Sequence, residues 1–361
     1  MVKSLNRVDA LKEEAFEKKG FDGFLVTNEK SLLYFTSCPG LAGLLIPKVG
    51  ENTVYVYSTN YEQAKAEAHG FNVEMLKRGE DLMAKIGAEV KTAKIKKLAV
   101  DALSYDSYHS LAKCLKGKTK LKARGELVWE LRRVKDENEI MFMKKAGELA
   151  DVGIKVAYEV IRPGIKEIEA AAEIEYAMRR EGSWGTAFES IVASGARSAF
   201  PHGGCSEREI ENGDLVVVDI GAAYQHYCSD ITRTLVAGRA SEKQKKLYEI
   251  VKEAQERAFQ AIKPKAKAKD VDAIARKVIA DAGYGGYFVH GLGHGIGLDV
   301  HEQPTINSQS KDKLMIGNVV TDEPGIYFVG FGGVRIEDTV LVQKRHGDRL
   351  TKSPYSLETR Q

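Results

Sequence analysis

The pattern of apolar and polar residues divides the chain into two regions. Up to about residue 125, short apolar runs alternate with longer mixed segments, and one of these, YEQAKAEAHG, has helical spacing. The runs that predict strands are FDGFLVTN, GLLIP, NTVYVYS and KKLAVDAL. This alternation is typical of an α/β domain. Residues 126–161 then keep helical spacing as far as Pro163-Gly164, which predicts one long charged helix.

The rest of the chain contains a repeat. Residues 158–182 align without a gap with residues 259–283, and Pro163 meets Pro264. Each copy predicts the end of one helix, a proline turn, and a second helix that glycine stops. A β-rich stretch follows each copy. We therefore predict one domain of two related halves rather than a solenoid, which needs at least three repeats.

Length and composition set the broad class. A chain of 361 residues is long enough for two domains, expected at 1–125 and 126–361. The first twenty residues lack the apolar centre of a secretory signal, and no apolar run is long enough for a membrane span. Four widely spaced cysteines without a C-x-x-C pair indicate reduced thiols. We expect a cytoplasmic protein without a membrane partner.

Charge does not point to nucleic acid. The net charge is only +3, and the basic runs at 113–122 and 263–269 have no interleaved aromatic residues. Both runs are interpreted as solvated surface.

Four acids interrupt strongly apolar strands in the two β-rich stretches. A turn near Tyr224-Gln225 would set Asp219 opposite Asp230, and a turn near Gly330 would set Glu323 opposite Glu337. Facing like charges destabilise a ladder, and buried unpaired carboxylates cost several kcal/mol. A cluster of divalent cations between the two halves would remove this repulsion.

The alternative is that these acids face water or pair with Arg233 and Arg335. For a single acid that alternative is favoured. It is disfavoured for four acids at equivalent places in both halves.

The segment HGLGHGIGLDVHEQP (290–304) holds three of the chain's eight histidines. One of them is expected to be a nitrogen ligand and the others to line the pocket. Carboxylates with one imidazole suit Mn²⁺, Co²⁺, Fe²⁺ or Zn²⁺. No G-x-G-x-x-G register fits this segment, and the H-E-x-x-H signature of zinc proteases is missing.

These residues resemble a known family. The five metal ligands of the "pita-bread" dinuclear metallopeptidases match Asp219, Asp230, His294, Glu323 and Glu337. The phrases GHGIGLDVHE, EPGIY and GGVRIEDT resemble those of the aminopeptidase P and prolidase branch, and residues 1–125 resemble a creatinase-type domain. The resemblance covers nearly the whole chain. It implies an α/β (α+β) fold: a creatinase-type amino-terminal α/β domain followed by a pseudo-twofold pita-bread catalytic domain.

The resemblance also implies an activity and its residues. Two divalent ions, Mn²⁺ foremost, would support hydrolysis of the bond before a proline in second position. Glu323 would be both ligand and acid/base. His290 and His301 would position the substrate and stabilise the oxyanion, while His202 and Arg335 would bind the substrate. The implied assembly is a homodimer. Tyr34 and Phe35 are candidates for the wall of the pocket in that dimer, although burial in their own domain is favoured for both.

One departure bears on substrate length. Archaeal-type prolidases usually carry an arginine just after the VHE-x-P segment, where this chain has Thr305. A strict dipeptidase must bind a free carboxylate, for which a planar arginine is the best donor. We therefore favour an Xaa-Pro aminopeptidase narrowly over an Xaa-Pro dipeptidase. Methionine aminopeptidase and a metal-free binding relative of the fold are the further alternatives.

Overall fold

The computed structural model describes residues 2–359, with side chains from residue 6 onward. The chain forms two compact units, Met1–Arg132 and Arg133–Gln361. The division lies later than the expected boundary near residue 125. The reason is that helix α6 (Gly125–Arg132) packs on α1 (Val2–Lys12) of the first unit.

The first unit is built on a six-stranded sheet with the order β4-β3-β2-β1-β5-β6. The four strands predicted from apolar runs are all present: β1 (Gly23–Val26), β2 (Gly43–Pro47), β3 (Thr53–Tyr57) and β5 (Lys97–Val100). The edge strands β4 (Asn72–Leu76) and β6 (Lys120–Ala123) were not predicted, because β4 is only partly buried, β6 is mostly exposed, and neither has an apolar run. The helices of this unit, besides α1 and α6, are α2 (Glu29–Thr36), α3 (Tyr61–Glu67), α4 (Leu82–Thr92) and α5 (Tyr105–Leu115). Tyr34 and Phe35 on α2 are both buried.

The single long helix predicted over 126–161 is wrong, because the chain breaks between α6 and α7 (Glu137–Val160). Asp136 starts α7 with a capping box: its carboxylate accepts from the backbone N–H of Glu139, whose side chain accepts from the backbone N–H of Asp136. Such a cap stabilises a helix start by about 1 kcal/mol. The break coincides with the division between the two units.

The predicted repeat of the second unit is confirmed. Helices α8 (Glu167–Arg180) and α10 (Ala268–Asp281) begin and end 101 positions apart, and α7 and α9 (Glu242–Ala261) end 101 positions apart. Even the turns correspond, since Gly164 and Lys265 are equivalent and have φ of 90° and 70°. The two helix pairs therefore share one backbone path.

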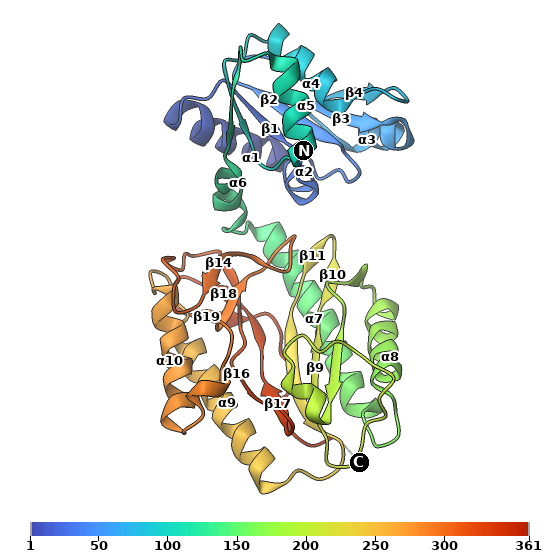
Figure 1. The fold of residues 1–361 in the computed structure, drawn as a ribbon, viewed down its shortest axis with the longest axis vertical. Helices are drawn as coiled ribbons and strands as arrows, with labels where there is room; N and C mark the ends of the chain where they lie inside the picture. Colours follow the sequence, from blue (N-terminus) through green and yellow to red (C-terminus); the bar gives the residue numbers. More distant parts are fainter. Residues whose placement is uncertain (1, 360–361) are drawn as a thin grey trace. The chain divides into compact units, whose positions relative to one another are not determined.

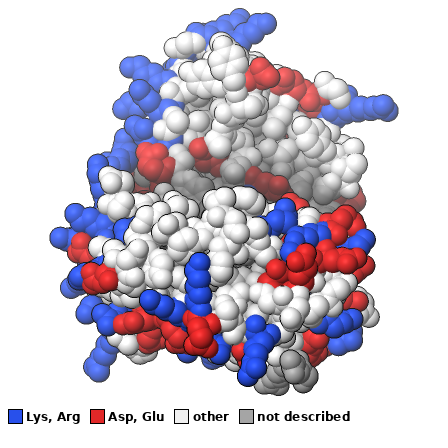
Figure 2. All heavy atoms as spheres, turned by 60° about the horizontal axis from the view of Figure 1, so that its bottom comes forward, with Lys and Arg blue, Asp and Glu red and all other residues white. Residues whose placement is uncertain are grey.

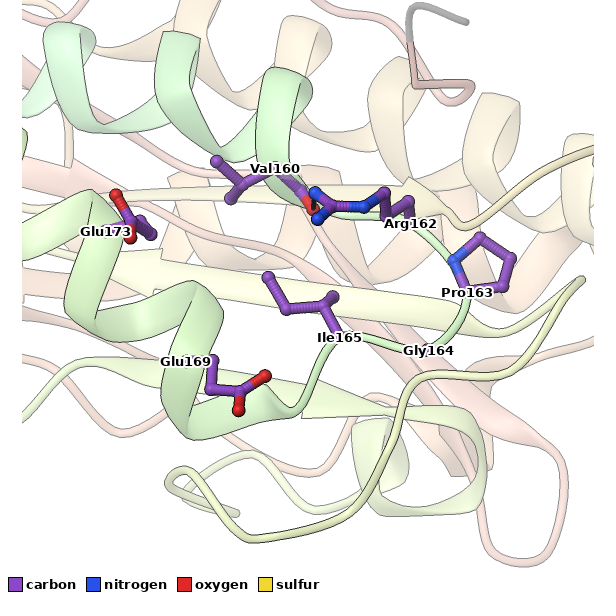
Figure 3. Close-up of a pocket in the computed structure, with 7 residues that line it drawn as sticks. All are labelled: Val160, Arg162, Pro163, Gly164, Ile165, Glu169 and Glu173. Carbon is purple, nitrogen blue, oxygen red and sulfur yellow. Dashed lines mark hydrogen bonds between the residues drawn. The ribbon is translucent and has the colours of Figure 1, made fainter.

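Figure 3 shows the first of these turns, with Pro163 and Gly164 between α7 and α8. Beside it lies a surface pocket of about 580 Å³, lined in part by Arg162, Glu169 and Glu173. None of the nine residues predicted for the functional site lines this pocket.

Strands fill the space beside each helix pair (Figure 1). The strands of the first half are β7 (Gly185–Thr186), β8 (Ile191–Ser194), β9 (Leu215–Ile220), β10 (Ala222–Tyr224), β11 (Tyr227–Cys228) and β12 (Ile231–Val236). Those of the second half are β13 (Gly293–Gly295), β14 (Glu302–Ile306), β15 (Val319–Asp322), β16 (Gly325–Phe328), β17 (Gly332–Arg335), β18 (Asp338–Val342) and β19 (Gly347–Arg349). One apolar core joins α7 and α8 mainly to β9 and β12, and another joins α9 and α10 mainly to β15 to β18. The predicted two-domain α/β fold is confirmed.

The surface carries charges of both signs. On the face drawn in Figure 2, Lys and Arg (blue) are interspersed with Asp and Glu (red). Within the described part of the chain, no helix is long and apolar enough to span a bilayer.

Candidate functional site

One cavity of about 690 Å³ in the second unit collects the predicted site residues. All nine line it: Asp219, Asp230, His294, Glu323, Glu337, His290, His301, His202 and Arg335. They come from both halves of the repeat and are up to 135 positions apart in the sequence. The fold thus brings together all nine residues predicted for the site.

The hairpin of the first half has a different register from the predicted one. Thr232, not Asp230, lies opposite Asp219. The turn is centred on Gln225 and His226, which both have positive φ (49° and 69°), one position later than predicted. Because side chains alternate along a strand, Asp230 still faces the same side as Thr232. The two acids therefore meet diagonally.

The hairpin of the second half has the predicted register. Asp322 pairs with Asp338 and Gly325 pairs with Arg335. Glu323 and Glu337 lie between these paired segments, and continuing either register sets them opposite each other. Both acids stand where the ladder is interrupted, so their carboxylates are free to face the cavity that they line.

Threonine hydroxyls join the two halves along β12. The Thr339 hydroxyl donates to the carbonyl of Asp230, the Thr232 hydroxyl donates to Glu337 Oε2, and the Thr234 hydroxyl donates to the carbonyl of Arg335 (2.8, 2.7 and 2.8 Å). All three threonines are fully buried. The contacts recur at every second residue, which aligns β12 with 335–339 and brings Asp230 beside Glu337. The alternating threonines of ITRT are the signal in the sequence for this arrangement.

The carboxylates form a buried cluster whose negative charge exceeds the positive charge around it. Asp230 and Glu337 are 5% and 2% exposed, and Asp219 is 9% exposed. Burial, followed by the neighbouring carboxylates, raises the pKa of both Asp230 and Glu337 well above the ordinary value. One oxygen on each of these three acids has no hydrogen-bond partner within residues 2–359. Buried oxygens without partners are unfavourable unless a cation binds them.

His294 directs one ring nitrogen at these acids. Its Nδ1 lies 3.0 Å from the carbonyl of Gly295, which can only accept, so Nδ1 carries the proton. The other nitrogen, Nε2, lies 3.3 Å from Glu323 Oε1 and 3.8 Å from Asp230 Oδ2. Metal-binding histidines commonly use one nitrogen in this way while the other donates to a carbonyl. One ligand atom each from Asp230, His294 and Glu337 lie within 4.8 Å of one another.

The glycines on either side of His294 allow its strand to approach its neighbours closely. A side chain on Gly293 would collide with the carbonyl of Thr321, and one on Gly295 would collide with that of Gln303. The same segment is held by an ion pair between Glu302 and Lys135 (3.0 Å), both almost fully buried. The glycine-rich composition therefore serves close packing around the histidine.

Arg335 neutralises part of the negative charge of the carboxylate cluster. Its Nη2 lies 2.6 Å from Asp219 Oδ2 and its Nε donates to Thr232 Oγ1 at 3.1 Å. The pairing of an acid with Arg335, the sequence alternative, is thus present for Asp219. Arg233 instead pairs with Asp338 (2.9 Å), which is not among the predicted ligands.

A hydrogen-bonded chain leads from Arg335 to His290. Arg335 Nη1 donates to the Tyr327 hydroxyl at 2.9 Å, and that hydroxyl lies 2.8 Å from His290 Nε2. His290 Nδ1 lies 2.7 Å from the carbonyl of Gly291 and must donate to it, so Nε2 accepts from Tyr327. Burial lowers the pKa of His290, which keeps the imidazole neutral at neutral pH. Sequence reasoning missed Tyr327, although it lies within the EPGIY phrase.

The outer part of the cavity is more open and partly apolar. His202 and His301 are exposed, and the His301 ring packs against His294 with 4.3 Å between ring centroids. Thr305 lies opposite His294 across β13 and β14 and also lines the cavity. The apolar lining is Phe188, Ile191, Phe200, Pro201, Val289 and Val300. The cavity therefore combines charged groups at depth with an apolar wall.

Comparison with known proteins shows the family of the chain that forms this cavity. Residues 141–344 match metallopeptidase family M24, and residues 7–134 match the creatinase/prolidase N-terminal domain. The chain belongs to metallopeptidase family M24. It is 44% identical over 346 residues to an Xaa-Pro dipeptidase of Pyrococcus horikoshii, covering 95% of this chain and 96% of that protein.

Solved structures of proteins named as Xaa-Pro peptidases have the same fold. An Xaa-Pro dipeptidase from Bacillus anthracis has a TM-score of 0.93 and 40% identity, over 98% of this chain and 99% of that one. An X-Pro aminopeptidase from Thermotoga maritima has a TM-score of 0.87 and 38% identity, over 95% and 99%. Both structures cover the two units of this chain, so the family resemblance extends to the whole molecule.

Proposed function

We propose that this M24 peptidase is an Xaa-Pro dipeptidase, which hydrolyses the bond between an amino-terminal residue and a proline in second position. The observation that carries the proposal is the cluster of buried carboxylates and one imidazole at the bottom of the cavity. The relatives support the substrate, because those from Pyrococcus horikoshii and Bacillus anthracis are both named Xaa-Pro dipeptidases. The apolar wall of the cavity suits a proline ring.

The donor set fits divalent metal ions. Asp219, Asp230, His294, Glu323 and Glu337 would hold two ions, with Mn²⁺ the foremost candidate because the set is rich in carboxylate oxygen and contains one imidazole. Bound there, the ions would supply Lewis acidity and a water of lowered pKa. The buried oxygens without partners on Asp219, Asp230 and Glu337 support this assignment.

Glu323 is proposed to move the proton. Burial acts to raise its pKa, but in the metal-free protein a protonated His294 beside it and the charge of Arg335 dominate and lower it to about 2. In the metal-free protein the carboxylate is therefore ionised at neutral pH, and beside bound metal it would accept a proton from the attacking water. The same group would then pass the proton to the proline nitrogen as that nitrogen leaves.

The remaining residues are proposed to orient the substrate. His202 and His301, at the open part of the cavity, would contact the peptide on either side of the scissile bond. His290 is held by the chain from Arg335 through Tyr327, in which its Nε2 accepts a hydrogen bond. The proposed role of His290 in stabilising the oxyanion therefore requires Nε2 to leave Tyr327 and to gain a proton that it can donate. Arg335 would hold Asp219 in place while its own guanidinium borders the substrate.

Metal removal should change the pH dependence of stability. The folded-state pKa values of Asp230 and Glu337 are raised, so these groups stabilise the metal-free fold below the unfolded pKa of about 4. That stability is lost as pH rises through the raised values. Metal binds the ionised carboxylates. The gain in melting temperature on adding Mn²⁺ to chelated protein should thus be larger at about pH 8 than at about pH 5; an equal or smaller gain at pH 8 would contradict this account.

Substrate length has a second candidate, an Xaa-Pro aminopeptidase. The related Thermotoga maritima protein carries that name. Thr305 also places an uncharged side chain where prolidases of the archaeal type usually carry arginine. The relatives named dipeptidase outweigh this single position in our proposal. The narrow preference for the aminopeptidase that the sequence suggested is therefore replaced.

A direct comparison of substrates decides between the two. For an Xaa-Pro dipeptide against its carboxyl-extended tripeptide, with Mn²⁺ present, kcat/KM should favour the dipeptide by about a hundredfold, or about 2.7 kcal/mol. Thr305→Arg should increase that preference, and Thr305→Val, which adds no charge, should leave it unchanged. Comparable values for the two peptides in the unmodified enzyme would favour the aminopeptidase.

We also propose a homodimeric, cytoplasmic enzyme. The family resemblance supports the dimer, and the four cysteines, which are all free, suit a reducing compartment. Sedimentation that shows a monomer at working concentrations would contradict the dimer.

A further inference from the structure

The first unit contains a segment with an excess of positive charge. Residues 91–124 hold nine lysines and one arginine but only two acids. The run at 113–122 within this segment is the one predicted to be solvated surface. The structure adds that Lys116 and Lys118 from this run meet Lys91, Lys94 and Lys96 from another part of the chain around a single pocket of about 320 Å³.

The pocket lies where two helices end and two parallel strands begin. Helices α4 and α5 both terminate there, and β5 and β6 start there with Lys97 paired to Lys120. Its floor is fixed by the buried Ile95, whose carbonyl accepts from the Thr119 hydroxyl at 2.7 Å. The pocket is therefore built from the ends of regular elements rather than from a mobile loop.

Two of the lysines occupy backbone positions that favour glycine. Lys94 and Lys116 have φ of 55° and 49°, the left-handed conformation. A residue with a side chain costs roughly 1–2 kcal/mol there. Gly117, which follows Lys116, also has a positive φ and is a glycine as expected. At Lys94 and Lys116, which line the pocket, the chain has lysine instead. Such an exception points to a use for the charge.

The positive charge exceeds what the surroundings neutralise. The carboxyl ends of two helices supply about half a negative charge each. Asp22 adds one more, because its carboxylate accepts from the backbone N–H groups of Lys96 and Lys97. Within the described chain, none of the five ammonium groups has a carboxylate within 4.0 Å. About three positive charges remain without a partner.

We propose that this pocket binds a compact polyphosphate, of the size and charge of inorganic triphosphate. Lysine ammonium groups are point charges that suit phosphate oxygens from several directions, whereas a carboxylate ligand would favour the planar fork of arginine. The volume is at the small end of ligand pockets. Among the described lining residues none is aromatic, so a base has no surface on which to stack.

Calorimetric titration of the metal-loaded protein with sodium triphosphate tests the proposal. The double variant Lys94→Gln and Lys118→Gln should weaken binding at least tenfold. The control variant Lys65→Gln and Lys77→Gln removes two exposed lysines at α3 and β4, the opposite edge of the sheet, and should leave the affinity within twofold.

Each other outcome overturns the proposal. Equal affinity in all three proteins would place triphosphate elsewhere, such as on the metal ions proposed to be held in the second unit. Failure of the unmodified protein to bind would remove the site altogether. If duplex DNA bound more tightly than triphosphate, and the first double variant weakened DNA binding to the same extent, the ligand of this pocket would be nucleic acid rather than a compact polyphosphate.

Discussion

Glu337→Gln is expected to lower kcat/KM for an Xaa-Pro dipeptide by far more than about 100-fold. Loss of a residue that only hydrogen-bonds to a metal ligand costs roughly 10–100-fold, and Glu337 is proposed to be a ligand itself. The substitution keeps the shape of the side chain and its hydrogen bond from Thr232 (2.7 Å) but removes the charge that would hold a cation. It also removes repulsion from Glu323 and Asp219 in the metal-free protein. We therefore expect opposite effects: activity and bound metal fall, while the melting temperature of the chelated protein rises.

Glu337 is a cleaner test than Asp219, because Asp219 also neutralises the buried Arg335. Glu148→Gln is a matched control, since Glu148 is exposed on α7 and forms only a surface pair with Lys145. It should change none of the three measurements. If Glu337→Gln retained metal and activity, Glu337 would not be a ligand.

Arg233→Met is expected to destabilise the second unit by about 3–5 kcal/mol, the cost of breaking a buried ion pair. Arg233 is fully buried, and its guanidinium donates to Asp338 and to the carbonyls of Glu337 and Ser353. Methionine fills similar volume but leaves these acceptors without their donor. Because Arg233 holds the backbone of Glu337 at 2.6 Å, metal affinity should fall as well.

Urea unfolding of the metal-loaded protein measures this effect. Arg257→Met is the control, because Arg257 is exposed on α9 and pairs only with Glu253 one turn away. An exposed pair of this kind contributes at most about 0.5 kcal/mol. A loss below about 1 kcal/mol for Arg233→Met would show that the buried pair does not hold this part of the fold together.

The features of the fold that depend on local pattern were predictable. The apolar runs of β1, β2, β3 and β5 have their own signal, and so does the repeat that ends α8 and α10 at equivalent positions. The break before α7 also had a signal, the capping box in Asp136-Glu137-Asn138-Glu139, which the continuous helical spacing concealed. The edge strand β6 had none, because its exposed lysines carry no apolar pattern.

The site residues were predictable by type and place, but their contacts were not. Register in the first hairpin depends on Gln225 and His226 adopting positive φ, which residues with side chains seldom do, so the sequence lacked the usual glycine signal. The second hairpin has Gly330 at its turn, and there the register was correct. The chain from Arg335 through Tyr327 to His290 joins residues whose meeting depends on strand packing, which no periodicity encodes.

The most direct test of the account is a titration of chelated enzyme with Mn²⁺. Bound metal per chain, from elemental analysis, and kcat/KM for an Xaa-Pro dipeptide are measured on the same samples. The account predicts no activity without metal and recovery as two ions bind per chain, with no recovery in the Glu337→Gln variant. Full activity in protein free of metal would contradict it, and protein that binds no metal would favour a binding relative of the fold.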